Sequence, residues 1–148
     1  MSFTQNSKFL RLSGAIAAAT TDVTNLTSVD MTGYEAATIV VGVGTVAATA
    51  VTSVKLQASS DDGGSDAWSD LEGTSISIAD SDDDTLVVME VIQPQKRYLR
   101  PYVGRGTATA AFDGIWCIQT GPKSGAVTQS TSDVSSIERH LTPDEGTA

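Results

Sequence analysis

Residues 85–104, TLVVMEVIQPQKRYLRPYVG, decide the fold class of this chain. The first part, residues 85–92, is a run of apolar and β-branched residues, a composition that suits a strand on a pleated, half-buried surface. Pro94 has no backbone N–H to donate and marks the end of this strand. Strand composition resumes at residues 98–103, where Pro101 predicts an edge position or a β-bulge. The stretch therefore predicts two strands joined by a tight connection.

The remaining apolar runs predict further strands of the same core. Residues 35–46 are apolar on both faces of an extended chain, which predicts a central strand, and residues 51–59 alternate between apolar and polar, which predicts a strand with one wet face. Shorter strands are expected at residues 8–12 with a continuation at 14–20, at 67–71, at 75–79, and at 108–120 with Phe112, Ile115, Trp116 and Ile118 in the core. The pattern predicts an all-β fold, a single β-sandwich or jelly roll of about seven to nine short antiparallel strands with extended N- and C-terminal arms.

A length of 148 residues suits one domain. We assign residues 1–122 to the sandwich, including an N-terminal arm at residues 1–12, and residues 123–148 to a polar C-terminal arm. The C-terminal arm has no sustained periodicity, although residues 132–141 could form a short helix capped by Ser132, Asp133 or Ser135. We expect both arms to serve assembly.

Charge and composition exclude several classes of function. The net charge of −9 repels a phosphate backbone, so nucleic-acid binding is not expected. No apolar run approaches the length of a membrane span. The single histidine, His140, lies in the polar arm, and the single cysteine, Cys117, lies in an apolar strand and is expected to be a buried thiol. We therefore expect no enzyme, no metal centre and no cofactor.

The charged segments leave alternatives open. The aspartates of residues 60–66 and 80–84 could bind calcium, but neither segment has EF-hand spacing, so solvated loops are the simpler interpretation. A basic cluster could form a carboxylate clamp or merely balance the acidic loops; its members are Lys96, Arg97, Arg100 and Arg105. Trp68, Tyr98 and Tyr102 could stack on a sugar or bind a protein, although core and edge positions are the simpler interpretation.

Several segments together resemble one family of proteins. They are GYEAATIVV at residues 33–41, VKLQASSDD at 54–62, WSDL at 68–71, KRYLR at 96–100 and the closing strand that ends at Ile118. The chain resembles, over about residues 28–120, the head decoration or capsid cement proteins of tailed phages. The resemblance does not extend to the two arms.

This resemblance implies a virion protein on the outer surface of the capsid, with a β-sandwich or jelly-roll fold, that bridges subunits of the major capsid protein and stabilises the shell. It also implies a homo-dimer or homo-trimer. The interface candidates are then aromatic, apolar and basic residues of the arms and of the KRYLR segment: Phe3, Phe9, Arg97, Tyr98, Arg100, Ile137, Arg139 and Leu141. The alternative function is a carbohydrate- or receptor-binding β-sandwich module on a virion or cell surface, in which Trp68 and the loop at residues 60–71 would form the site.

Overall fold

The structure, a computed structural model, describes residues 2–147 and is almost entirely β. A short helix, α1 (Phe3–Asn6), precedes ten strands: β1 (Ser7–Ser13), β2 (Ile16–Ala19), β3 (Val29–Asp30), β4 (Ala36–Val46), β5 (Val51–Ser59), β6 (Ser69–Asp70), β7 (Ile76–Ile78), β8 (Leu86–Ile92), β9 (Tyr98–Gly106) and β10 (Ala110–Thr120). The all-β prediction is confirmed. Within residues 2–147 no helix is long and apolar enough to cross a membrane.

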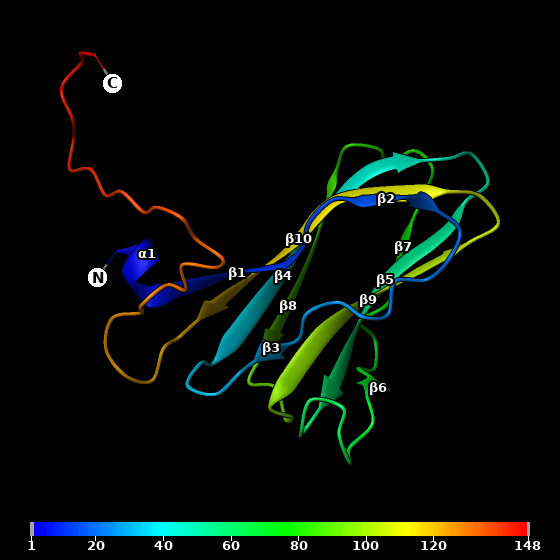
Figure 1. Cartoon of the computed structure of the whole chain (residues 1–148), viewed down its shortest axis with the longest axis horizontal. Helices are drawn as coiled ribbons and strands as arrows, with labels where there is room; N and C mark the ends of the chain where they lie inside the picture. The colour runs from blue at the N-terminus through cyan, green and yellow to red at the C-terminus, as the bar shows by residue number, and fades with distance from the viewer. Residues whose placement is uncertain (1, 148) are drawn as a thin grey trace.

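The strands form two antiparallel five-stranded sheets (Figure 1). Sheet A has the order β1-β10-β4-β8, with β2 also beside β10, and sheet B has the order β3-β9-β5-β6, with β7 also beside β5. β1 with β2, and β6 with β7, occupy one interrupted strand position each, which explains why ten strands appear where about seven to nine were expected. Eight strand positions in this order form a jelly-roll sandwich.

One hydrophobic core fills the space between the two sheets. Its centre is fully buried, as the alternation of β4 and β5 predicted, with Ile39, Val41 and Val43 from sheet A facing Val54 and Leu56 from sheet B. Each inward side chain removes apolar surface from water, and the summed burial holds the two sheets together.

Two predicted core residues lie on the opposite face of sheet A. Phe112 and Ile115 are buried as expected, but Trp116 is 38% exposed and Ile118 is half-buried, so their placement in the core was wrong. The register of β10 against β4 shifts on both sides of Phe112. These irregularities reset the alternation, and the small thiol of Cys117 fills the inward position between Trp116 and Ile118.

Pro101 lies in an unbroken stretch of the ladder between β9 and β5, opposite Leu56, so the expected bulge is absent there. The N–H and C=O of Val103 bond to Val23, on the side of β9 away from β5. Pro101 lies two residues earlier and directs its nitrogen to that same side. On that side of β9, Pro101 lies between two contacts, the bridge from Val103 to Val23 and the pair of Leu99 with Val29, and the ladder is interrupted between them. Pro101 is therefore at a local edge of the sheet, which confirms the expected edge position.

The two arms behave differently. The second half of the N-terminal segment, from Ser7, forms β1 in sheet A, where alternation at residues 8–12 predicted a strand. In the C-terminal arm the expected helix at residues 132–141 is wrong: the N–H groups of Asp133 and Val134 donate to the carbonyl of Ser130 in a turn, and no helix follows up to residue 147. Such a short helix without a surface to pack on is not stable in water.

Candidate protein-docking surface

The outer face of sheet A is the most apolar exposed surface of the described chain. Three of the seven exposed large hydrophobic side chains lie on β8 alone: Leu86, Val88 and Ile92, at 65%, 54% and 67% exposure. Trp116 of β10 lies on the same face, together with the half-buried Val40, Ile118 and Phe9. We call this set the apolar face. An apolar surface shared by several strands marks a site of interaction with another macromolecule.

The strand register arranges this face in rows. Val40 of β4 lies between Val88 of β8 and Trp116 of β10, and the next strand, β1, adds Arg11 beside Trp116. The Trp116 ring lies across glycines of β4 and β10, where an added Cβ at Gly114 would stand 2.8 Å from the ring. The indole therefore lies flat on the sheet and is available on its outer side.

A hollow of about 530 Å³ opens on this face between β1, β4 and β10. Phe9, Val40, Trp116 and Ile118 supply its apolar wall, while Arg11 and Asp133 stand at its polar side. The mixture of an apolar floor and a polar rim is the usual composition of a protein-binding surface.

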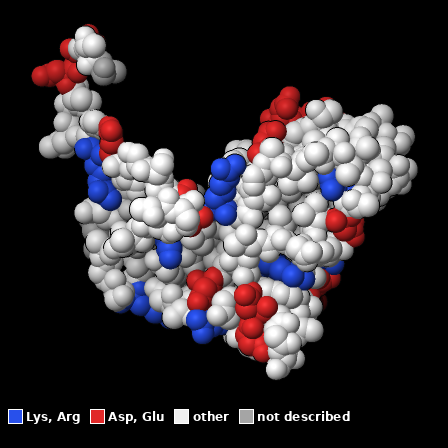
Figure 2. All heavy atoms as spheres, in the orientation of Figure 1, with Lys and Arg blue, Asp and Glu red and all other residues white. Residues whose placement is uncertain are grey.

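The predicted interface residues of the arms extend this surface at one end of the molecule. The rings of Phe3 and Phe9 meet edge to face with centroids 5.7 Å apart, and Phe3 is 60% exposed. Arg139 donates from Nε to Oγ1 of Thr4 at 2.6 Å, which holds the C-terminal arm beside α1. Beyond this point the arm runs away from the sandwich and ends in acidic side chains (Figures 1 and 2). Ile137 is half-buried, and Leu141 is 96% exposed.

The first part of the C-terminal arm is fastened to the free edge of β1. Gln129 donates from Nε2 to the carbonyl of Ser7 at 2.7 Å and accepts the N–H of Phe9 on Oε1 at 3.0 Å. Asp133 accepts the N–H of Arg11 at 3.0 Å, and the N–H of Val127 donates to the carbonyl of Gln5. Side chains thus replace a neighbouring strand at this edge and fix where the arm leaves the domain.

The basic residues do not gather into one clamp. Arg97 donates to both carboxylate oxygens of Asp30, at 3.0 and 2.7 Å, and this bond holds the pKa of Asp30 well below its usual range. The same guanidinium lies 4.9 Å from the ring centre of Tyr98. Arg100 faces elsewhere, with Nε donating to Gln57 at 2.9 Å. Each therefore has its own partner within the chain.

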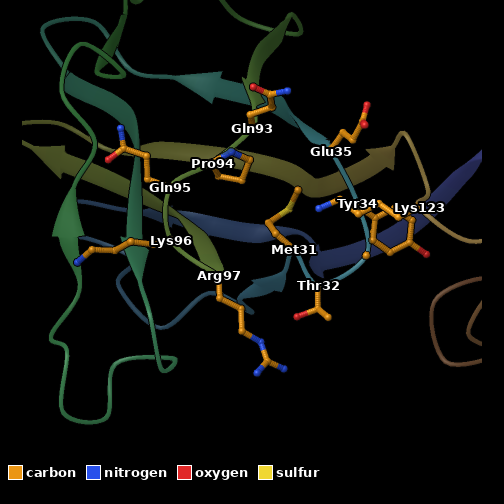
Figure 3. A pocket seen from close by; sticks show the side chains of 11 residues that line it. Met31, Thr32, Tyr34, Glu35, Gln93, Pro94, Gln95, Lys96, Arg97 and Lys123 are labelled. Carbon is orange, nitrogen blue, oxygen red and sulfur yellow. The ribbon is translucent and has the colours of Figure 1, made fainter.

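Lys96 and Arg105 are also engaged separately. The ammonium of Lys96 lies 2.8 Å from Asp66, and the hydrogen bond between them lowers the pKa of Asp66 to about 2. Arg105 donates to the carbonyls of Ala17, Thr21 and Ala110, which ties the chain after β2 to the end of β9. Lys96 and Arg97 point apart around an open hollow of about 620 Å³ beside β3 and the end of β8 (Figure 3). That hollow has no convergent set of donors.

Carboxylates of the acidic loops accept hydrogen bonds from backbone N–H groups. Asp61 accepts the N–H groups of Gly64, Ser65 and Asp66, and these bonds, led by that of Ser65, lower its pKa. Asp83 accepts the N–H of Val46 at 2.6 Å. Within residues 2–147 no group of His, Cys, Asp and Glu side chains is arranged to hold a metal ion. The aspartates therefore shape loops by capping backbone groups.

Trp68, just before β6, and Tyr102 of β9 are half-buried, and each has a cationic side chain over one face of its ring. The guanidinium of Arg100 lies 4.5 Å from the ring centre of Trp68, and an added Cβ on Gly63 would stand 2.3 Å from its Nε1. Lys55 lies 4.6 Å from the ring centre of Tyr102. A sugar ring stacking on Trp68 would have to displace Arg100 from that side of the indole.

The two residues with catalytic potential lie apart. Cys117 is 1% exposed in the core, and burial raises the pKa of its thiol to about 12. His140 lies in the exposed arm, 3.0 Å from Glu138. A catalytic cysteine must be a thiolate or must lie beside a base that takes its proton. The thiol of Cys117, in contrast, stays protonated at neutral pH.

Two comparisons with known sequences found no match. No protein-family model matches the chain, and no curated protein shows significant similarity to it.

Apart from Phe9, the residues of the apolar face were missed in the sequence, because residues 85–92 were interpreted as a strand on a half-buried surface. The available signal was the pair of adjacent strands, residues 35–46 and 85–92, that are apolar at both alternating sets of positions. Two such strands side by side predict a sheet that is covered on both sides.

Proposed function

We propose that this protein decorates the outside of a phage capsid and stabilises the shell by bridging subunits of the major capsid protein. The observation that carries the proposal is the apolar face of sheet A on a small acidic jelly roll. A face with an exposed tryptophan among β-branched side chains has the composition of the centre of a protein-binding surface.

The C-terminal arm supports the same proposal. It is fastened at Gln129, Asp133 and Arg139 and then leaves the domain, so it can contact a second subunit while the apolar face contacts a first. Two linked contacts bind far more tightly than either one alone, because the second contact forms at a high effective concentration. Ile137, Arg139 and Leu141 are the residues with which the arm would bind.

The acidic surface also suits a position outside the shell. A net charge of −9 disfavours contact with packaged DNA and with other anionic surfaces. The alternative, a carbohydrate- or receptor-binding module, has less support, because Arg100 occupies the side of Trp68 on which a sugar would stack.

Co-sedimentation with empty capsid shells tests the proposal. The protein should bind shells of its own phage to saturation and raise the temperature at which they disrupt, because a ligand that binds only the intact state stabilises that state. Absence of saturable binding would contradict the proposal, and a glycan screen would then test the alternative.

Variants sharpen this experiment. Trp116→Ser removes the central side chain of the apolar face, and we expect at least about tenfold weaker shell binding. Val51→Ser is the matched control, since Val51 is 66% exposed but belongs to sheet B. Deletion of residues 134–148 keeps the contacts of Gln129 and Asp133, so the domain should stay folded while shell binding weakens. Equal binding by all three variants would contradict both proposed contacts.

A further inference from the structure

One edge of the two sheets is left open. The edges of sheet B are β3, β6 and β7, which have two or three residues each, and short edge strands discourage pairing. The edge of sheet A at β1 and β2 is capped by Gln129, Asp133 and Arg105. The remaining edge is β8, which has seven residues and pairs with β4 alone among the described strands.

The backbone of β8 directs unused hydrogen-bonding groups away from the sheet. The carbonyl of Thr85 accepts from Val43, and the N–H of Gln93 donates to Glu35, so the odd-numbered residues face β4. Successive residues of a strand direct these groups to opposite edges. The even-numbered residues of β8, Leu86, Val88, Glu90 and Ile92, therefore present their N–H and C=O groups outward.

β8 lacks the devices that usually protect an edge strand. Its register with β4 has no shift from Leu86 to Ile92, so no bulge twists it away. It contains neither proline nor lysine, and Glu90 is its only charged residue. Two hollows, of about 440 and 200 Å³, lie between it and sheet B. Such a regular apolar edge is a template for pairing with another strand.

A second copy of β8 fits this edge in one register. An antiparallel pair about a two-fold axis at Met89 sets Leu86 against Ile92 of the second copy and Val88 against Glu90, so all four outward residues are paired. Moving the axis to Glu90 would set two carboxylates directly opposite each other, which is unfavourable. Moving it to Val88 would set Ile92 against Asp84, which has φ 56 and belongs to the preceding turn.

Charges beside β8 favour the same antiparallel arrangement. The acidic loop at residues 80–84 comes directly before the strand, and Lys96 and Arg97 follow it. Within residues 2–147 no Lys or Arg forms an ion pair with that loop. Antiparallel pairing about Met89 would bring the start of β8 in each copy, with its acidic loop, beside the end of β8 in the other copy, which Lys96 and Arg97 follow.

The C-terminal arm of a second copy fits this edge less well. Its apolar residues Val134, Ile137 and Leu141 are three and four residues apart. An added strand requires alternation by two, which β8 has and the arm lacks.

We infer that the protein is a two-fold homo-dimer whose sheets A join through antiparallel pairing of β8 with β8 of the second copy, centred on Met89. The pairing makes the two apolar faces coplanar and continuous. The role of this dimer as a bivalent unit that binds a shell rests on the proposed function. The formation of the dimer does not depend on that function.

Analytical ultracentrifugation of the full chain and of charge variants tests the dimer and its register. In this register position 88 faces Glu90 of the second copy. Val88→Glu should therefore weaken the dimer by about tenfold or more, whereas Val88→Lys should preserve it. The double variant Val88→Glu, Glu90→Lys should restore it. Val51→Glu, an equally drastic change at an exposed valine of sheet B, should leave the dimer unchanged.

Cross-linking gives a second measurement on the folded protein. Leu86→Cys with Ile92→Cys should give a disulfide-linked dimer on oxidation, because the two positions face each other between copies. Within one copy they are separated by roughly 20 Å of extended strand, too far for a disulfide. Cys117 is buried and does not compete.

The outcomes are distinct. A monomeric or trimeric wild-type protein, or equal effects of Val88→Glu and Val88→Lys, would overturn the inference. Circular dichroism of each variant shows whether a lost dimer reflects unfolding. A dimer that does not bind shells would contradict only the proposed function, and a monomer that binds them would contradict only the dimer.

Discussion

Gln129→Ala should release the C-terminal arm without unfolding the sandwich. The amide side chain makes two partly buried hydrogen bonds, with Ser7 and Phe9. A net contribution of about 0.5–1.5 kcal/mol for each bond gives a loss of about 1–3 kcal/mol for this contact. β1 keeps its ladder with β10, so the loss falls on the arm and on the edge of β1.

Hydrogen exchange measures this effect at a single amide. The Phe9 N–H donates to Gln129, so its exchange should become about 5-fold to 100-fold faster in the variant, since 1.4 kcal/mol corresponds to tenfold. Proteolysis within residues 134–147 should also accelerate. Gln95→Ala changes an exposed glutamine of the β8–β9 connection and serves as the control. Unchanged protection of Phe9 in Gln129→Ala would refute the role of Gln129 as the anchor.

Two further predictions concern the loop after β5. Gly63→Ala should destabilise the protein by about 1–3 kcal/mol, because Gly63 has a φ of 81 and the new Cβ would meet Trp68. Gly73→Ala is the control for the backbone cost alone, since Gly73 has a φ of 75 and open space around it. Equal losses of Tm in the two variants would contradict the contact with Trp68. Lys96 is the main reason why the pKa of Asp66 is lowered from 3.8 to about 2, so ionised Asp66 stabilises the fold above its unfolded pKa and loses this contribution as the pH falls from about 4 to about 2. The wild-type protein should therefore have a higher Tm than Asp66→Asn at neutral pH, and this difference should disappear across that window. A difference that persists below pH 2 would show that the carboxylate is not its source.

Periodicity predicted most strands because it is a local property. Residues 51–59 form β5 as expected, and residues 35–46 form β4 from Ala36. Alternating apolar residues favour an extended chain wherever they lie, and turn-forming residues bound them. The error at Trp116 has a nonlocal cause, since the register shifts beside Phe112 exist only in the pairing with β4.

The candidate site was predicted less completely than the fold. Phe3, Phe9 and Leu141 were named as apolar residues of the polar arms, and all three lie at one end of the molecule or on the arm that leaves it. The sequence left open whether Arg97 and Arg100 act together in a clamp, and the structure gives each a separate partner far away in the sequence, Asp30 and Gln57. No spacing rule reveals such partners, because they are set by which strands become neighbours.

The sequence by itself determined that the chain is all-β, approximately where most of its strands lie, and that its charge disfavours nucleic acid. These properties follow from composition and from a period of two residues. Only the tertiary structure decided that β8 is an edge, that its outward side chains join those of β4 and β10 in one apolar face, and that Gln129 and Asp133 cap the opposite edge. Strand order brings distant segments together, and the free energy that selects it comes from burying the common core.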